Sequence, residues 1–198
     1  PAASGVVTPG QLLVRLENGT EGSTARLEDI EIRAFSFEGT EQVFEKTGLT
    51  GPGGVIVFPE VPLAQGRRVV VSALFQGVIY VAHGEGGITP GDGASSLEVT
   101  VPVFESTGSL KNVTLNHFHM VIAPAKGKEG YSVSEILLAQ NTGQTSVIGG
   151  DSTTVTLGLD APDGLQDFSV LEGVLNRHVS LGDGTIAYTG PLQPGEAR

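Results

Sequence analysis

The feature that most limits the possible folds of this chain is a series of short β-forming runs, each closed by Gly, Pro, Asn or Asp. Examples are DIEIRAF, RRVVVSALF, SLEVTVPVF and TTVTLGL. No run continues into a long stretch with the 3.6-residue periodicity of an amphipathic helix. Short strands separated by such turns are typical of β-sandwiches. The pattern therefore predicts an all-β protein, and it carries little information about chemistry.

The length of the chain predicts two domains. With 198 residues it is long for one small sandwich and suits two domains of about 100 residues each. The first domain would close with the alternating run Leu97–Val103, in which Pro102 marks an edge strand or a strand end. Because the joint then falls near Ser106–Ser109, we expect β-sandwich domains over residues 1–106 and 107–198.

In the first domain, the spacing of apolar residues predicts about seven or eight strands after an extended arm over residues 1–10. The clearest local prediction is a hairpin made of Arg67–Phe75 and Val78–Ala82. Its turn falls on Gln76 and Gly77, where glycine supplies the positive φ that a tight turn needs.

The second domain opens with a long predicted strand over Leu110–Ala123. Its apolar face changes sides between Leu115 and Phe118, so we expect a bulge or bend near Asn116. Further strands are predicted at Tyr131–Ala139, Thr153–Leu159 and Phe168–Leu171, weakly around His178–Ser180, and at Thr185–Thr189. The terminal GPLQPGEAR is too broken by proline to add another strand. A seven-stranded sandwich would need one more, and an open edge beside its core must be covered by backbone from elsewhere.

The composition argues against several classes of partner. There are 22 acidic and 11 basic residues, giving a net charge of −11, whereas nucleic acids and anionic lipids require clustered Lys and Arg. The chain has no cysteine for a disulfide and no apolar run long enough to span a bilayer. Its first residues, PAASGVVTPG, are small and neutral, as expected just after a signal-cleavage site. We therefore expect a mature, extracytoplasmic protein.

The segment GGVIVFPEVPLAQGRRVVVSALFQG resembles the carboxypeptidase-regulatory-like domains of exported bacterial proteins. The positions that carry the resemblance are Gly54, Phe58, Val61, Pro62, Gly66, Val69–Ala73 and Gly77. The resemblance covers about residues 10–104 and implies a transthyretin-like or Ig-like sandwich, and the second half is similar to the Ig-like domains that follow such modules. Two tandem Ig-like or transthyretin-like sandwiches are therefore the expected fold. Domains of this kind serve as spacers, adhesion modules and pilus parts.

Two histidines offer a possible metal site. His117 and His119 form an H-x-H pair, which on a strand places both imidazoles on one face, about 7 Å apart. A third ligand could come from His83, His178 or Asp183. The alternative is a pair of partly buried histidines that bond to the backbone.

Other chemistry has little support in the sequence. There is no G-x-S-x-G or H-E-x-x-H motif and no cysteine nucleophile, and the Gly-rich segments read as turns because no helix follows them. We predict no enzymatic activity, no catalytic residues and no cofactor.

These observations together predict a structural subunit of a cell surface or of a filament or pilus-like assembly. In this hypothesis an extended arm, Pro1–Gly10 with the start of the first strand, fills the open edge of the next subunit by β-strand addition. The predicted subunit-contact residues are Pro1, Ala2, Ala3, Val6, Val7, Leu12 and Val14. The partner would be another copy of the chain or another envelope protein. The alternatives are an accessory subunit on the outer face of a membrane complex and a metal- or ligand-binding module that uses His117 and His119.

Overall fold

The computed structural model describes residues 9–125, 127, 129–149, 155–161, 163, 165, 169 and 178–195. It is nearly all β, so the predicted all-β class is confirmed. The chain divides into two compact units, Pro1–Glu105 and Ser106–Arg198, called unit 1 and unit 2 below, and the sequence places the boundary after residue 106. The helix in the described part is the short 3-10 helix η1, Gly84–Gly86, and no described helix is long and apolar enough to cross a membrane.

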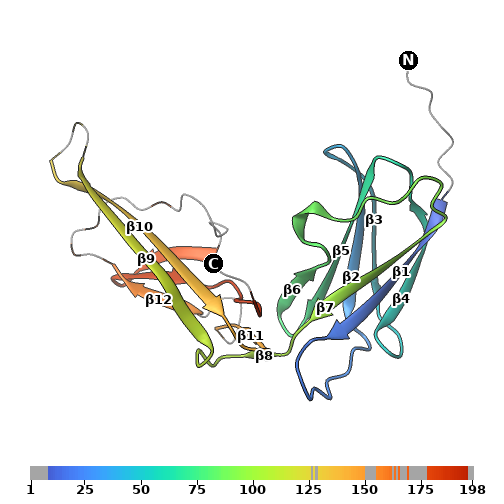
Figure 1. Ribbon diagram of the computed structural model, residues 1–198, viewed down its shortest axis with the longest axis horizontal. Helices are drawn as coiled ribbons and strands as arrows, with labels where there is room; N and C mark the ends of the chain where they lie inside the picture. Colours follow the sequence, from blue (N-terminus) through green and yellow to red (C-terminus); the bar gives the residue numbers. More distant parts are fainter. Residues whose placement is uncertain are drawn as a thin grey trace. The chain divides into compact units, whose positions relative to one another are not determined.

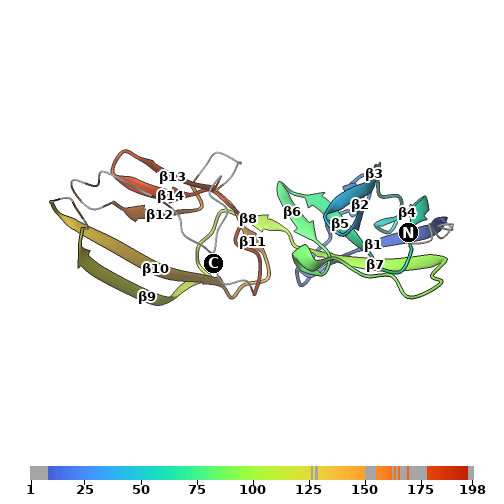
Figure 2. The ribbon, with the colours of Figure 1, turned by 90° about the horizontal axis from the view of Figure 1, so that it is seen from above.

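Unit 1 arranges its described strands in two sheets that lie face to face (Figure 1 and Figure 2). One sheet has the order β4-β1-β7 and the other β3-β2-β5-β6. The strands are β1 (Pro9–Asn18), β2 (Glu31–Glu38), β3 (Glu41–Leu49), β4 (Val55–Pro62), β5 (Arg67–Phe75), β6 (Val78–Val81) and β7 (Ser96–Val103). Strand β1 lies in the middle of its sheet, antiparallel to β4 and parallel to β7.

The core of unit 1 follows from the two-residue period of its strands. Leu12, Val14 and Leu16 alternate with more exposed neighbours along β1, and all three are buried. Val69 and Val71 of β5 are also buried, in the opposite sheet. Complete burial of one such side chain stabilises the fold by about 1.5–3 kcal/mol relative to leaving it exposed.

The predicted hairpin of β5 and β6 is confirmed. Phe75 pairs with Val78, and the two residues between them, Gln76 and Gly77, have φ values of 47° and 82°. Two successive residues with positive φ are the signature of a type I′ turn, which matches the twist of the strands it joins. Tyr80 of β6 then donates a hydrogen bond of 2.8 Å to the carbonyl oxygen of Phe104.

Unit 2 is built around a long hairpin that faces a second, smaller sheet (Figure 1 and Figure 2). The hairpin pairs β9 with β10, the smaller sheet has the order β12-β14-β13, and two very short strands, β8 and β11, pair in parallel. The strands are β8 (Ser106–Thr107), β9 (Val113–Pro124), β10 (Tyr131–Asn141), β11 (Ser146–Val147), β12 (Leu157–Asp160), β13 (Val179–Gly182) and β14 (Thr185–Tyr188).

Two sequence predictions for unit 2 differ from this arrangement or fall beyond it. The strand predicted at Thr153–Leu159 begins at Leu157, and residues 151–154 lie outside the described part. The strand predicted at Phe168–Leu171 also lies outside the described residues, apart from Ser169.

Candidate interaction surface

The β9–β10 hairpin contains the bulge that the sequence predicts. Leu115 pairs with Ala139 and His117 with Leu138, which leaves Asn116 without an opposing residue on β10. An extra residue on one strand shifts the alternation of side chains by one position. The change of apolar face between Leu115 and Phe118 is the sequence signal of this shift. The side-chain amide of Asn116 donates a hydrogen bond of 2.6 Å to Oε1 of Gln140.

Beyond the bulge, the hairpin exposes large apolar side chains, which we call the hairpin surface. Its members are Leu115, Met120, Val121, Ile122, Tyr131, Val133, Ile136 and Leu138. Their exposed fractions run from 39% at Leu138 to 75% at Tyr131. Contiguous apolar patches of this kind on a protein surface mark interaction sites or aggregation-prone surfaces.

The hairpin surface occupies both faces of the hairpin. Ile122 and Val133 oppose each other on one face, whereas Val121, Ile136 and Leu138 belong to the other. A strand that packs against a core on one side only would alternate apolar and polar residues, and strands that are apolar on both faces are normally buried on both. The composition of the hairpin therefore fits an element that is covered from both sides.

The backbone edges of the hairpin are also open in the described part of the chain. There, β9 pairs with β10 alone, and the outer edge of β10 is met at Asn141, where the amide of Gly195 donates a hydrogen bond of 2.8 Å to the Asn141 carbonyl oxygen. An open edge presents a row of unpaired N–H and C=O groups that can bind a further strand. Natural sequences usually protect such edges with charged residues, yet β9 has no Asp, Glu, Lys or Arg and β10 has only Glu135.

The base of the hairpin is fixed by one buried side chain, Asn141. Its Nδ2 atom donates hydrogen bonds to the carbonyl oxygens of Thr145 at 2.7 Å and Leu192 at 2.8 Å. Its Oδ1 atom accepts a bond of 2.9 Å from the amide of Gly143. Leu192 is itself buried and pairs with Val147. The C-terminal segment therefore forms no regular strand, as predicted, but it closes one end of unit 2.

The two predicted metal ligands lie on β9. His117 pairs with Leu138 and His119 with Ile136, so the two positions share a face of the strand. The side chain of His119 is exposed, and that of His117 is outside the described part.

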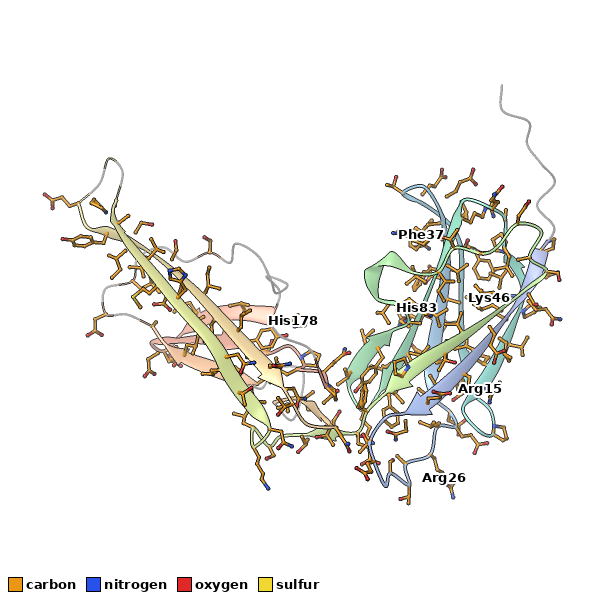
Figure 3. The ribbon with its side chains drawn as sticks, viewed as in Figure 1. Arg15, Arg26, Phe37, Lys46, His83 and His178 are labelled. Carbon is orange, nitrogen blue, oxygen red and sulfur yellow. The ribbon has the colours of Figure 1, made fainter. Side chains whose placement is uncertain are left out.

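The predicted third ligands are dispersed. His83 belongs to unit 1, whereas His178 lies in unit 2, with its ring centroid 6.3 Å from that of Tyr188 (Figure 3). Asp183 occupies the turn between β13 and β14, with a φ of 49°. Among the described residues, no group of three His, Asp or Glu side chains is placed to hold a metal ion. The metal site stays a prediction.

The predicted subunit contacts require a correction. Pro1, Ala2, Ala3, Val6 and Val7 lie outside the described residues. Leu12 and Val14, however, are completely buried in unit 1, and β1 is paired along both edges. These two side chains are not available to another subunit, because exposing them would dismantle the sheet that they occupy. The arm is also shorter than predicted, since β1 begins at Pro9.

The hairpin surface is the feature that sequence reasoning missed. Its signal was present in the runs HMVIA and EILLA, where apolar residues follow one another without the polar alternation seen in β1 and β7. Such runs fit a strand buried on both faces equally well, and the sequence does not tell whether the cover comes from the same chain.

No protein-family model, no curated protein and no solved structure matches the chain. The resemblance to carboxypeptidase-regulatory-like domains therefore remains a sequence-based expectation.

Proposed function

We propose that this protein is a non-enzymatic, extracytoplasmic structural subunit that assembles by β-strand addition at the β9–β10 hairpin. The observation that carries the proposal is the combination of open backbone edges and exposed apolar side chains on the same element. In strand addition, main-chain hydrogen bonds provide affinity, and alternate side chains of the added strand provide specificity. The hairpin offers both kinds of contact.

The proposed mode of assembly explains the unusual composition of the hairpin. A strand added to an edge extends the sheet, so elements packed on the enlarged sheet can cover both of its faces. Covering Val121 and Ile122, each more than half exposed, removes apolar area from water on both faces. An isolated two-stranded ribbon is marginal in water, and a third strand gives it the width of an independently stable sheet.

The source of the added strand is part of the proposal. The sequence predicts the arm Pro1–Gly10 as donor, and because Pro9 and Gly10 belong to β1, residues 1–8 are the part of that arm left to act. An accessory subunit of a membrane complex, the main alternative, would use the same hairpin to dock on a different protein. The metal- or ligand-binding alternative has less support, because no third ligand is gathered in the described part of unit 2.

The test compares two lysine substitutions in the full chain. Val121→Lys places a charge on the edge strand β9, and Val57→Lys places one on β4, an edge strand of unit 1 with similar exposure. Light scattering and negative-stain imaging would report assembly, and a synthetic peptide of residues 1–10 would serve as a donor in trans. We expect the first substitution to abolish assembly or peptide binding and the second to preserve them.

A wild-type chain that neither associates with itself nor binds the peptide would leave the proposed function without support. Equal effects of the two substitutions would also contradict it, because the contact would then not lie at β9.

A further inference from the structure

We infer that the strand added to β9 is β9 of a second copy, which pairs antiparallel about a two-fold axis to form a continuous sheet of two hairpins. This inference rests on the proposed strand addition and names both its edge and its partner. Pairing of identical strands about a two-fold axis is an isologous contact, in which each copy presents the same surface.

Of the two edges of the hairpin, β9 is the better acceptor. The outer edge of β10 is occupied at Asn141 by the C-terminal segment, and β10 carries the charged residue Glu135. In the described part of the chain, no such contact or charge lies on β9. The whole length of β9 is therefore open to a further strand.

The charge of the protein favours a second copy as the partner. Each copy carries a net charge of −11, so two copies repel each other unless they meet at a neutral surface. Among the described strands of more than four residues, β9 is the one without any Asp, Glu, Lys or Arg. A basic partner would instead be expected at an acidic surface, because interfaces pair complementary potentials.

The structure of β9 also restricts the register. The bulge at Asn116 interrupts the regular ladder, and Pro124 has no N–H group to donate. The uninterrupted stretch is His117–Ala123, and its middle residue is Met120. A two-fold axis that keeps each face of the sheet whole must oppose residues an even number apart and so passes through one residue. We place that residue at Met120.

In this register the apolar faces of the two hairpins continue into each other. Met120 opposes Met120 of the second copy, and His119 opposes Val121 of the second copy. Val133, which pairs with Ile122, extends one apolar face, and Ile136 and Leu138 extend the other. Each face of the joined sheet is then lined by apolar side chains from both copies.

The absence of cysteine makes a cross-linking test specific. In the full chain, Met120→Cys places two thiols on the axis, where directly opposed Cα atoms are about 4.5–5.5 Å apart and within disulfide range. Ile122→Cys lies on the same face but is displaced by about 14 Å along the strand from its own counterpart. We expect oxidation to produce a covalent dimer with the first variant and none with the second, and Val57→Cys serves as a control in unit 1.

The mass in solution provides a second measurement. The expected species is a concentration-dependent dimer with twice the chain mass of 20.4 kDa. It should persist when residues 1–8 are deleted and disappear with Val121→Lys, with the folding of each variant checked by circular dichroism.

Three outcomes would overturn the inference. A wild-type chain that stays monomeric at every accessible concentration contradicts self-pairing. Equal cross-linking of Met120→Cys and Ile122→Cys contradicts the two-fold register. Association that is lost on deletion of residues 1–8 and survives Val121→Lys assigns the contact to the arm; in that case self-pairing of β9 fails while assembly through the arm remains.

Discussion

Replacing Asn141 with alanine would remove the side chain that holds three backbone groups of unit 2 together. The carbonyl oxygens of Thr145 and Leu192 and the amide of Gly143 would each lose a hydrogen bond of 2.7–2.9 Å. A buried group left without its partner costs about 1–3 kcal/mol, and a group that water can reach costs less. The bond to Leu192 is buried and the other two are partly buried, so we expect a total loss of about 3 kcal/mol.

A loss of this size is large for a small unit. For a domain of 60–100 residues, each kcal/mol lowers the melting temperature by about 4–8 °C, so the transition of unit 2 should fall by about 12 °C or more. Hydrogen exchange followed by mass spectrometry separates unit 2 from unit 1 in the intact chain. The amides of Leu192 and Gly195, which bond to the backbone of Val147 and Asn141, should lose protection together.

Asn116→Ala provides a matched control on the facing strand. The amide of Asn116 makes one exposed hydrogen bond, to Gln140, so its removal should change the stability of unit 2 by about 0.5 kcal/mol or less. A loss below about 1 kcal/mol for Asn141→Ala, or equal losses for the two variants, would refute the reasoning that burial makes Asn141 the fixed point of the hairpin.

Three further predictions follow from the same structure. Gly77→Ala should destabilise unit 1 by about 1 kcal/mol because φ is +82° in open space, whereas Gly86→Ala, which has open space and no positive φ, should be nearly neutral; urea unfolding compares them. Leu12→Ala should cost unit 1 about 2–5 kcal/mol through a core cavity, and an effect on assembly without this loss would contradict its burial. Raising the salt concentration should strengthen self-association, because it screens the repulsion between two chains of charge −11; light scattering that shows weakening would contradict a neutral contact.

The sequence predicts local features best where one residue type satisfies one backbone requirement. Gln76 and Gly77 identify a turn because few residues accept positive φ, and Asn116 identifies a bulge because the side-chain period is two. The role of Leu12 and Val14 could not be predicted in this way. Their alternation shows that one face is buried, but it does not reveal that β1 lies between β4 and β7 with no open edge.

The candidate surface was harder to predict, for a related reason. The run EILLA on β10 has the composition of a core strand, and composition alone does not locate the cover. Asn141, which decides how the C-terminal segment closes unit 2, gives no signal beyond that of an ordinary turn residue. Its three hydrogen bonds join segments that only the folded chain brings together.

Self-pairing at β9 also limits how far assembly can proceed. An isologous contact consumes the open edge of β9 in both copies, and the outer edges that remain belong to β10, where Glu135 and the C-terminal segment hinder further addition. A filament would therefore need a second, different contact, and residues 1–8 are the sequence-predicted source of one. If both contacts operate, deletion of residues 1–8 should remove the species larger than a dimer and spare the dimer itself. Long filaments that persist after this deletion would show that β9 pairs head-to-tail, without a two-fold axis.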